Sequence, residues 1–279
     1  MADLLQIENL SAGYGEAVVL NGVNAALAEG ETLALLGRNG VGKSTTIRML
    51  LSLIHPSSGS IELFGKSIQK NRASILEQVG AIIERPDLYP YLTATEHLQL
   101  FAKVRKKKIE ASNIQNTLEK VGLAGRAQDK VQTFSLGMKQ RLGIAIALVH
   151  NPSLIILDEP TNGLDPQGIA DIRNLILNLS REQGKTVLVS SHLLSEIEQV
   201  ATRLIIIDKG CKLVEGDSKE LFDTSKTVVA IQTLDNKQAT ELLLQSSWAA
   251  QLLVNRSTDK EIFIGNDKKN LEALRGFFN

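Results

Sequence analysis

The sequence has few of the residues that would place a protein outside the cell or inside a membrane. Its single cysteine, Cys211, excludes an internal disulfide, and its N-terminus, MADLLQIENL, lacks the basic-then-apolar layout of a secretory signal. The most apolar stretch, LGIAIALVHNPSLIIL (142–157), is interrupted by His150, Asn151 and Pro152. It is also shorter than the roughly 20 residues that cross a bilayer. We therefore expect a reducing, cytosolic setting, and if the protein works at a membrane, another chain must cross it.

A net charge is also absent. The 31 lysines and arginines balance the 31 aspartates and glutamates, and no long basic face is present that would neutralise a run of phosphates. Nucleic acid is therefore not expected as a partner. With 279 residues, one large α/β domain with a small appendage is the expected organisation.

Short apolar runs rich in β-branched residues alternate with helical periodicity along the chain. These runs are TLALLG (32–37), GAIIE (80–84), SLIILDE (153–159), KTVLVSS (185–191) and RLIIID (203–208). The pattern predicts an α/β fold with a mostly parallel sheet covered by helices, preceded by N-terminal antiparallel β elements.

Two segments depart from this alternation. Strand-like runs disappear between residues 91 and 151, where helical patterns such as TATEHLQLFAKVRKK follow one another, so we predict a helical insertion there. After residue 226 the runs TVVAIQTL, QLLVN and EIFIG combine with the helical patterns NKQATELLLQSS and NLEALRGFF. We therefore predict a main domain over residues 1–226 and a small C-terminal α/β tail over residues 227–279.

The stretch LLGRNGVGKSTTIRML (35–50) contains the pattern G-x-x-x-x-G-K-[ST] between an apolar strand and a helix, which is the context that a P-loop requires. Its glycines let backbone amides surround an anion at the start of the helix. We expect Lys43 to reach the β- and γ-phosphates, Ser44 to bind Mg²⁺ and Thr45 to add a phosphate contact. A glycine-rich turn that only caps a helix would explain neither the lysine nor the hydroxyls. The predicted nucleotide-binding residues of this loop are Gly37, Arg38, Asn39, Gly40, Val41, Gly42, Lys43, Ser44 and Thr45.

A second strand, LIILDEP (154–160), ends in two acids. Because parallel strands present their C-terminal ends at the same edge of a sheet, Asp158 is expected near the P-loop, where it can hold Mg²⁺. Glu159 points in another direction and can act as the general base that polarises the attacking water. Two acids after a strand can also cap a helix, but the accompanying P-loop favours a nucleoside triphosphate site.

Between these two motifs lies FSLGMKQRLGIAIALVHNP (134–152), which resembles the signature region of ATP-binding cassette (ABC) transporter ATPases. The family's usual LSGGQ corresponds to FSLGM, which departs at three of the five positions and keeps Ser135 and Gly137. These two residues can donate a hydroxyl and an amide to a γ-phosphate. The same stretch also has the apolar spacing of a core helix, and we expect it to be both.

The resemblance implies roles for further residues. Asp165, in EPTNGLDP, corresponds to the loop that communicates across a dimer, and Pro166 suits the first turn of the next helix. His192, directly after KTVLVSS, corresponds to the histidine that contacts the γ-phosphate and orients water, although a lone histidine is more often structural. Tyr14, in SAGYGEAVVL, corresponds to the aromatic residue that stacks on adenine, although a tyrosine in a glycine turn would look the same.

Glu84, in GAIIERPDLYPYLTATEHL (80–98), stands where the family normally has glutamine. A carboxylate can still bind Mg²⁺ or its water, but it adds charge and cannot donate a hydrogen bond. Together with FSLGMKQ, this glutamate resembles the ATPase subunits of lantibiotic-immunity and bacitracin-resistance exporters. The resemblance covers about the first four-fifths of the chain.

The resemblance implies an ATPase that forms a homodimer on binding ATP and works with integral membrane permease subunits at the inner face of the cell membrane. Two alternatives remain open at this point. One is an ABC ATPase that acts on ribosomes or DNA, although such relatives usually carry two cassettes or a long coiled coil, and neither is present. The other is a nucleotide sensor without turnover, which Glu159 and His192 disfavour.

Overall fold

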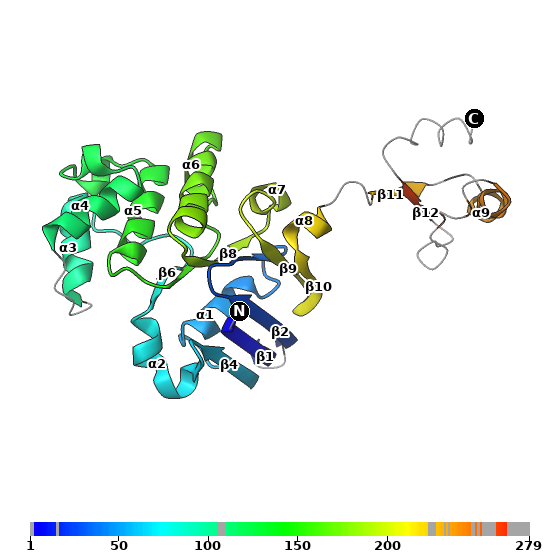
Figure 1. The fold of residues 1–279 in the computed structure, drawn as a ribbon, viewed down its shortest axis with the longest axis horizontal. Coiled ribbons are helices and arrows are strands. Elements are labelled where there is room, and N and C mark those ends of the chain that lie inside the picture. The colour runs from blue at the N-terminus through cyan, green and yellow to red at the C-terminus, as the bar shows by residue number, and fades with distance from the viewer. Residues whose placement is uncertain are drawn as a thin grey trace. The chain divides into compact units, whose positions relative to one another are not determined.

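The computed structural model describes residues 3–14, 17–104, 110–222, 227–231, 233, 235–246, 249, 252 and 261–266. The chain divides into two compact units, residues 1–218 and 219–279 (Figure 1). The described residues of the larger unit form two sheets with helices around them, and those of the smaller unit form a two-stranded sheet and a helix.

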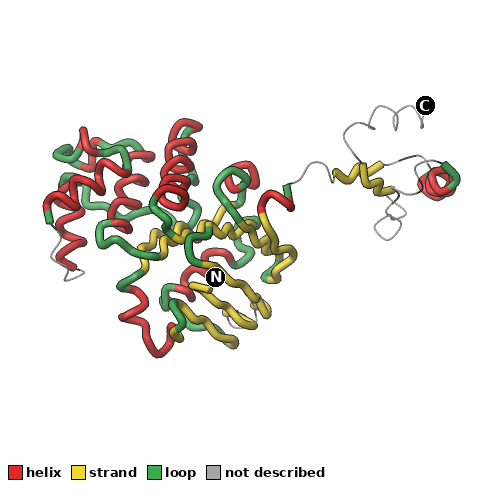
Figure 2. Tube along the Cα trace, viewed as in Figure 1, coloured by secondary structure: helices red, strands yellow, loops and turns green. Residues whose placement is uncertain are grey.

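A six-stranded sheet forms the centre of the larger unit, with the strand order β10-β9-β3-β8-β7-β6. Its strands are β3 (Thr32–Leu36), β6 (Val79–Ile82), β7 (Leu154–Leu157), β8 (Thr186–Ser191), β9 (Arg203–Asp208) and β10 (Cys211–Asp217). All neighbouring strands are parallel except the antiparallel pair β9 and β10. Every residue of β3, β7 and β8 is buried, as expected for parallel strands that helices cover on both faces (Figure 2). The predicted α/β fold with a mostly parallel sheet is confirmed.

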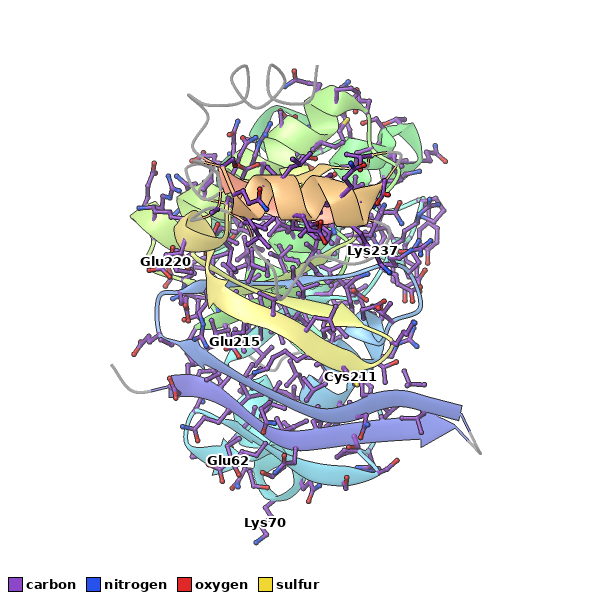
Figure 3. The ribbon with its side chains drawn as sticks, turned by 90° about the vertical axis from the view of Figure 1, so that its right-hand side faces the viewer. Glu62, Lys70, Cys211, Glu215, Glu220 and Lys237 are labelled. Atoms are coloured by element: carbon purple, nitrogen blue, oxygen red, sulfur yellow. The ribbon has the colours of Figure 1, made fainter. Side chains whose placement is uncertain are left out.

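A four-stranded antiparallel sheet with the order β2-β1-β4-β5 packs beside the central sheet. Its strands are β1 (Asp3–Tyr14), β2 (Ala17–Ala28), β4 (Ser58–Leu63) and β5 (Lys66–Ser67). The two sheets meet where the Asn21 amide donates to the Gly210 carbonyl at 2.9 Å. Figure 3 shows this order, from Glu62 on β4, across β1 and β2, to Cys211 and Glu215 on β10. Leu5, Leu20 and Leu27 of this sheet share one apolar core with Leu33 and Ile47.

Several helices pack around the sheets of the larger unit, and a side-chain cap marks the start of one of them, α6. They are α1 (Lys43–Leu50), α2 (Ile68–Leu76), α6 (Pro166–Leu177), the π-helical η3 (Asn178–Glu182) and α7 (Leu194–Ile197). The short helix α8 (Ser218–Leu221) follows β10 in the sequence, at the boundary between the two units. The start of α6 combines two favourable features, since the Asp165 carboxylate accepts from the Gly168 amide at 3.2 Å and proline occupies the first helical position.

Helices also fill the segment between β6 and β7, as the sequence predicts. They are α3 (Ala94–Val104), α4 (Ala111–Lys120), the short 3₁₀ turns η1 (Ala124–Arg126) and η2 (Val131–Thr133), and α5 (Leu136–Leu148). A capping box starts α3, because the Thr93 amide donates to the Glu96 carboxylate at 2.7 Å and the Glu96 amide donates to the Thr93 hydroxyl at 3.2 Å. The hydrogen bond from the Thr93 amide lowers the pKa of the Glu96 carboxyl.

The smaller unit pairs β11 (Thr227–Ile231) with β12 (Ile262–Asn266) in an antiparallel sheet and contains α9 (Asn236–Leu244). Asp235 begins α9, because its carboxylate accepts from the amides of Lys237 and Gln238 at 3.0 Å each. Apart from Leu252, the expected QLLVN strand and the final NLEALRGFF helix lie outside the described residues.

Gly80 in β6 marks a close contact between the sheet and the helical segment. A methyl group there would lie 2.2 Å from the Ala147 carbonyl oxygen and 2.9 Å from Cγ of Pro152. We therefore expect Gly80→Ala to lower the free energy of unfolding by about 1–3 kcal/mol, the usual cost of overpacking, in urea denaturation. Gly125→Ala is the control, since its added methyl group would meet nothing within 4 Å. Equal stability of the two variants would contradict this description of the contact.

Candidate nucleotide site

The predicted P-loop connects β3 to α1. Gly40 and Gly42 have φ values of 82° and 111°, a region in which residues with a side chain are strained. A methyl group at Gly42 would also lie 2.7 Å from Cδ2 of Leu20. Helix α1 begins directly afterwards at Lys43, so the loop presents a helix N-terminus, where anions bind favourably. One pocket joins this loop to the second motif and is lined by Asn39, Gly40, Gly42, Lys43, Ser44, Thr45 and Glu159.

Sheet topology brings three predicted loops together. Strand β8 lies between β3 and β7, and all three run parallel. The P-loop therefore follows β3 at the same edge at which Asp158 and Glu159 follow β7 and His192 follows β8. Residues about 150 positions apart in the sequence are thus neighbours at one end of the sheet, as the sequence predicts for the acidic pair.

The Glu159 carboxylate joins two of the other predicted catalytic residues. Its Oε1 lies 3.0 Å from the Lys43 ammonium, and its Oε2 lies 2.7 Å from Nδ1 of His192. An ionised carboxylate can only accept hydrogen bonds, so Nδ1 of His192 carries a proton in this arrangement. The structure therefore groups Lys43, Glu159 and His192 in one hydrogen-bonded cluster.

Lys43 is fully engaged by this chain. Besides Glu159, its ammonium donates to the carbonyl oxygens of Gly37 at 2.6 Å and Arg38 at 3.2 Å. An ammonium group has three protons to donate, and the lysine side chain is only 5% exposed. A phosphate that binds Lys43 must therefore displace one of these three oxygens. Only the Glu159 oxygen carries a negative charge, which repels the phosphate.

Asp158 has the features expected of a magnesium ligand. Its side chain is fully buried, and one oxygen, Oδ1, accepts from the Ser190 hydroxyl at 2.5 Å. The other oxygen, Oδ2, has no hydrogen-bond partner among the described residues. A buried carboxylate oxygen without a partner is costly, and hard oxygen atoms are the ligands that Mg²⁺ prefers. Asp158 therefore fits the predicted ion. Ser44, the other predicted ligand, lines the P-loop pocket next to Glu159, the residue that follows Asp158.

The described residues contain no cluster of three or more histidine, cysteine, aspartate or glutamate side chains that could hold a metal ion by themselves. Mg²⁺ commonly binds proteins through one or two side chains and takes its remaining ligands from phosphates and water. A site made by Ser44 and Asp158 would bind Mg²⁺ in this way.

Glu84, the third predicted magnesium ligand, contacts a side chain of α1 in this structure. Its carboxylate forms an ion pair with Arg48 at 2.8 Å, and its side chain is 63% exposed. Such an exposed pair contributes about 0–1 kcal/mol to stability, so it can be broken at little cost. Glu84 and Glu159 nevertheless line one hollow, together with Arg48, Ile83, Arg85, Asp87, Gln140 and Asn162.

Two predicted site residues have an unusual backbone. Glu84 has φ 58° and Glu159 has φ 49°, in the left-handed region that residues with a side chain rarely adopt. Such conformations cost about 1–3 kcal/mol each and tend to occur at functional sites. The sequence gives no sign of this strain, because neither position is a glycine or an asparagine.

The remaining predicted residues lie outside this cluster. Ser135 caps α5, since its hydroxyl accepts from the Met138 amide at 3.2 Å, and Gly137 lies in the first turn of that helix. Asp165 caps α6, as described above. In Figure 1, α5 stands with α3 and α4 in the helical group, apart from α1. Tyr14 is the last residue of β1, and its side chain lies outside the part of the chain that the structure describes.

Sequence reasoning missed a second hydrogen-bonded group beside the site. Oε2 of Glu196 accepts from the Thr161 hydroxyl at 2.6 Å and from the Ser191 hydroxyl at 3.0 Å. The Ser191 hydroxyl also accepts from the Leu193 amide at 3.0 Å. Glu196 therefore ties the loop after β7 to the loop that carries His192. The only sign in the sequence was a glutamate four residues after that histidine.

The loop geometry defines the class of the protein, because a P-loop beside an acidic pair at the end of a parallel strand is the site of a P-loop nucleoside triphosphatase. Comparison with known proteins then gives the family. The sequence matches the ABC transporter family over residues 20–162, which is more than half of the chain.

Curated relatives agree with this match. The chain is 41% identical over 258 residues to the bacitracin transport ATP-binding protein BcrA of Enterococcus faecalis, covering 92% of this chain and 83% of that protein. It is 42% identical over 214 residues to the lantibiotic transport ATP-binding protein SrtF of Streptococcus pyogenes, covering 77% of this chain and 91% of that protein.

A solved structure has the same fold. It is the dimeric post-hydrolysis state of the ATP-binding cassette MJ0796 bound to ADP and Pi, with a TM-score of 0.67 and 27% identity. The alignment covers 77% of this chain and 98% of that one. The chain therefore belongs to the ABC transporter family, and the predictions of a nucleotide-binding ATPase subunit for transport and of its resemblance to the bacitracin and lantibiotic group are confirmed.

Proposed function

We propose that this chain powers the export of a peptide antibiotic, such as a lantibiotic or bacitracin, through separate membrane permease subunits. This export would protect the cell that contains the transporter from the antibiotic. The observation that carries this proposal is the similarity to BcrA and SrtF, which are named for bacitracin and lantibiotic transport, over 92% and 77% of this chain. The chain also carries Glu84 and the FSLGM signature, the two sequence features that resemble this group.

The grouped side chains support a hydrolytic role for the site. Glu159 accepts a proton from the water that attacks the γ-phosphate, and His192 holds the carboxylate that does so. Lys43 binds the β- and γ-phosphates at the start of α1. Mg²⁺, held by Ser44 and Asp158, would neutralise charge on the phosphate oxygens. Tyr14 is proposed to stack on the adenine ring.

We propose that ATP joins two copies of this chain. Ser135 and Gly137 lie on a helix that stands apart from α1 in Figure 1, so they meet a γ-phosphate most simply when it is bound by a second copy. In a two-fold symmetric dimer each chain makes the same contacts with the other. Asp165 would then lie near the dimer interface. The dimeric structure of the similar cassette MJ0796 supports this arrangement. To shift the two chains from an almost entirely open to an almost entirely closed dimer, ATP must bind the closed state about 5.5 kcal/mol more favourably than the open state. Two charged sites can supply this difference.

The membrane-crossing part of the transporter is assigned to partner subunits. In the part of the chain that the structure describes, no helix has both the length and the apolar character needed to span a bilayer. We propose that the helical segment between β6 and β7, together with the loop at Glu84, transmits closure of the dimer to permeases at the inner face of the membrane.

Protection of living cells tests the proposal. Expressed in a sensitive bacterium together with its permease subunits, the chain is expected to raise the inhibitory concentration of bacitracin or of a lantibiotic. Glu159→Gln should abolish that protection, because ATP would be bound but not hydrolysed. Protection by Glu159→Gln equal to that of the unaltered chain would contradict the proposal. Recovery with ribosomes or DNA, and absence from membranes even when permeases are expressed, would instead favour an ABC ATPase outside transport.

A further inference from the structure

Ser190 lies at the centre of the predicted catalytic edge, although no motif in the sequence points to it. It is the fifth residue of β8 and is fully buried. In the register of the sheet, Val189 lies opposite Leu157 of β7, so the next position along places Ser190 beside Asp158. The serine therefore stands between β7 and the P-loop strand β3, where Leu35 is its partner.

The Ser190 hydroxyl contacts both acids of the site. It donates to Oδ1 of Asp158 at 2.5 Å and accepts from the backbone amide of Glu159 at 2.9 Å. A hydroxyl has one proton and two lone pairs, a carboxylate only accepts, and an amide only donates. The direction of both hydrogen bonds is therefore fixed by chemistry.

The first hydrogen bond selects which Asp158 oxygen remains for other ligands. With Oδ1 held by Ser190, Oδ2 is the buried oxygen that has no partner among the described residues. A carboxylate that was free to rotate would present either oxygen, and neither would be held in place. Ser190 thus orients the ligand that would bind Mg²⁺.

The second hydrogen bond acts on the general base. Glu159 has φ 49°, and a residue with a side chain holds such a conformation only where its surroundings impose it. The hydrogen bond from the Glu159 amide to Ser190 is one such restraint. It holds the backbone of the residue whose carboxylate contacts Lys43 and His192. One hydroxyl group therefore restrains both the ligand and the base.

We propose that Ser190 is a positioning residue that orients Asp158 toward Mg²⁺ and holds the backbone of Glu159 in its left-handed conformation. Ser190 itself touches neither nucleotide nor metal in this role. The inference rests on the proposed use of Asp158 for Mg²⁺ and Glu159 as base, but it does not depend on the cargo.

The test measures ATP binding by the purified full chain with Mg²⁺ and with EDTA, together with the Mg²⁺ concentration that half-saturates hydrolysis. Ser190→Ala should bind ATP as the unaltered chain does in EDTA, but it should lose most of the gain that Mg²⁺ gives. We expect the half-saturating Mg²⁺ concentration to rise and kcat to fall, each by roughly ten- to a hundredfold, the range for losing a hydrogen bond to a charged group. At a Mg²⁺ concentration that saturates each protein, KM for ATP should change much less.

Three further variants separate positioning from general stability. Ser180→Ala removes another buried hydroxyl, which donates to the Leu177 carbonyl at 3.3 Å away from the site, and should leave the Mg²⁺ response unchanged. Ser190→Thr keeps the hydroxyl and should restore most of the response. If Ser190→Ala does not fold, Ser190→Cys keeps a side chain of similar shape with a weaker donor and should show a raised Mg²⁺ requirement.

The outcomes distinguish this inference from the proposed function. A normal Mg²⁺ response in folded Ser190→Ala or Ser190→Cys overturns the role of Ser190, as does an equal loss in Ser180→Ala. Absence of any Mg²⁺ effect on ATP binding by the unaltered chain would instead contradict the magnesium site itself. Failure of the cellular protection experiment, with the Ser190 results as expected, would remove the antibiotic cargo and leave Ser190 as assigned.

Discussion

Glu159→Gln is expected to reduce the rate of ATP hydrolysis by about 10²–10⁴-fold, the usual contribution of a general base, while ATP binding persists. The amide has almost the same shape as the carboxylate but cannot take a proton from water. It also removes the negative charge that lies 3.0 Å from the Lys43 ammonium in this structure. Because a phosphate that approaches Lys43 must compete with that charge, the variant should bind ATP at least as tightly as the unaltered chain.

Two measurements check this expectation: steady-state phosphate release for hydrolysis, and equilibrium titration with a fluorescent ATP analogue for binding. Glu62→Gln is a matched control, since it makes the same chemical change at an exposed position on β4. It should alter neither quantity. Unchanged phosphate release by Glu159→Gln would exclude Glu159 as the base, and a loss of both binding and hydrolysis would indicate that the carboxylate supports the pocket instead. Steady phosphate release by the unaltered chain also excludes a sensor without turnover.

The sequence predicts this part of the site well because its chemistry is local. A P-loop is written in consecutive residues, and the apolar strands before Gly37, Asp158 and His192 place all three at one edge once the strands are parallel. The three residues meet at this edge whatever the order of the strands, because parallel strands present their C-terminal ends together.

Interactions between distant residues could not be predicted in the same way. The pair of Arg48 and Glu84 joins residues 36 positions apart, and nothing in the pattern around Glu84 indicates that its partner lies on α1. The hydrogen bonds of Ser190 depend on the register of β7 against β8, which the sequence of neither strand specifies alone. The positive φ at Glu84 and Glu159 likewise depends on tertiary packing, which overrides the preference of a glutamate.

Gly137 offers the sharpest test of the proposed dimer, because its own chain leaves room for a side chain. A methyl group there would meet only Cα of Gly168 at 3.9 Å, an ordinary contact. The residue lies in the first turn of α5, and alanine is favoured over glycine in helices by up to about 1 kcal/mol. Gly137→Ala should therefore leave the free energy of unfolding of the isolated chain unchanged or slightly raise it.

The same substitution should weaken a contact with a partner's nucleotide. If the backbone of Gly137 approaches a γ-phosphate bound by a second copy, a methyl group intrudes at both sites of the dimer. Overpacking of a tight contact costs about 1–3 kcal/mol, so we expect ATP-dependent dimerisation and hydrolysis to fall by about ten- to a hundredfold. Dimerisation is measured by light scattering. Both the Gly137→Ala protein and its parent should carry Glu159→Gln, so that bound ATP is not hydrolysed and the closed dimer does not dissociate.

Gly125→Ala is the matched control for this experiment, since its added methyl group would meet no atom within 4 Å. Gly125 lies in η1, outside α5. The Gly125→Ala protein should dimerise with ATP as readily as its parent. A stable Gly137→Ala protein that also dimerises normally would show that the start of α5 does not contact the partner's nucleotide. Loss of dimerisation without loss of stability requires that the defect lie between chains, because within one chain the glycine has no close neighbour to disturb.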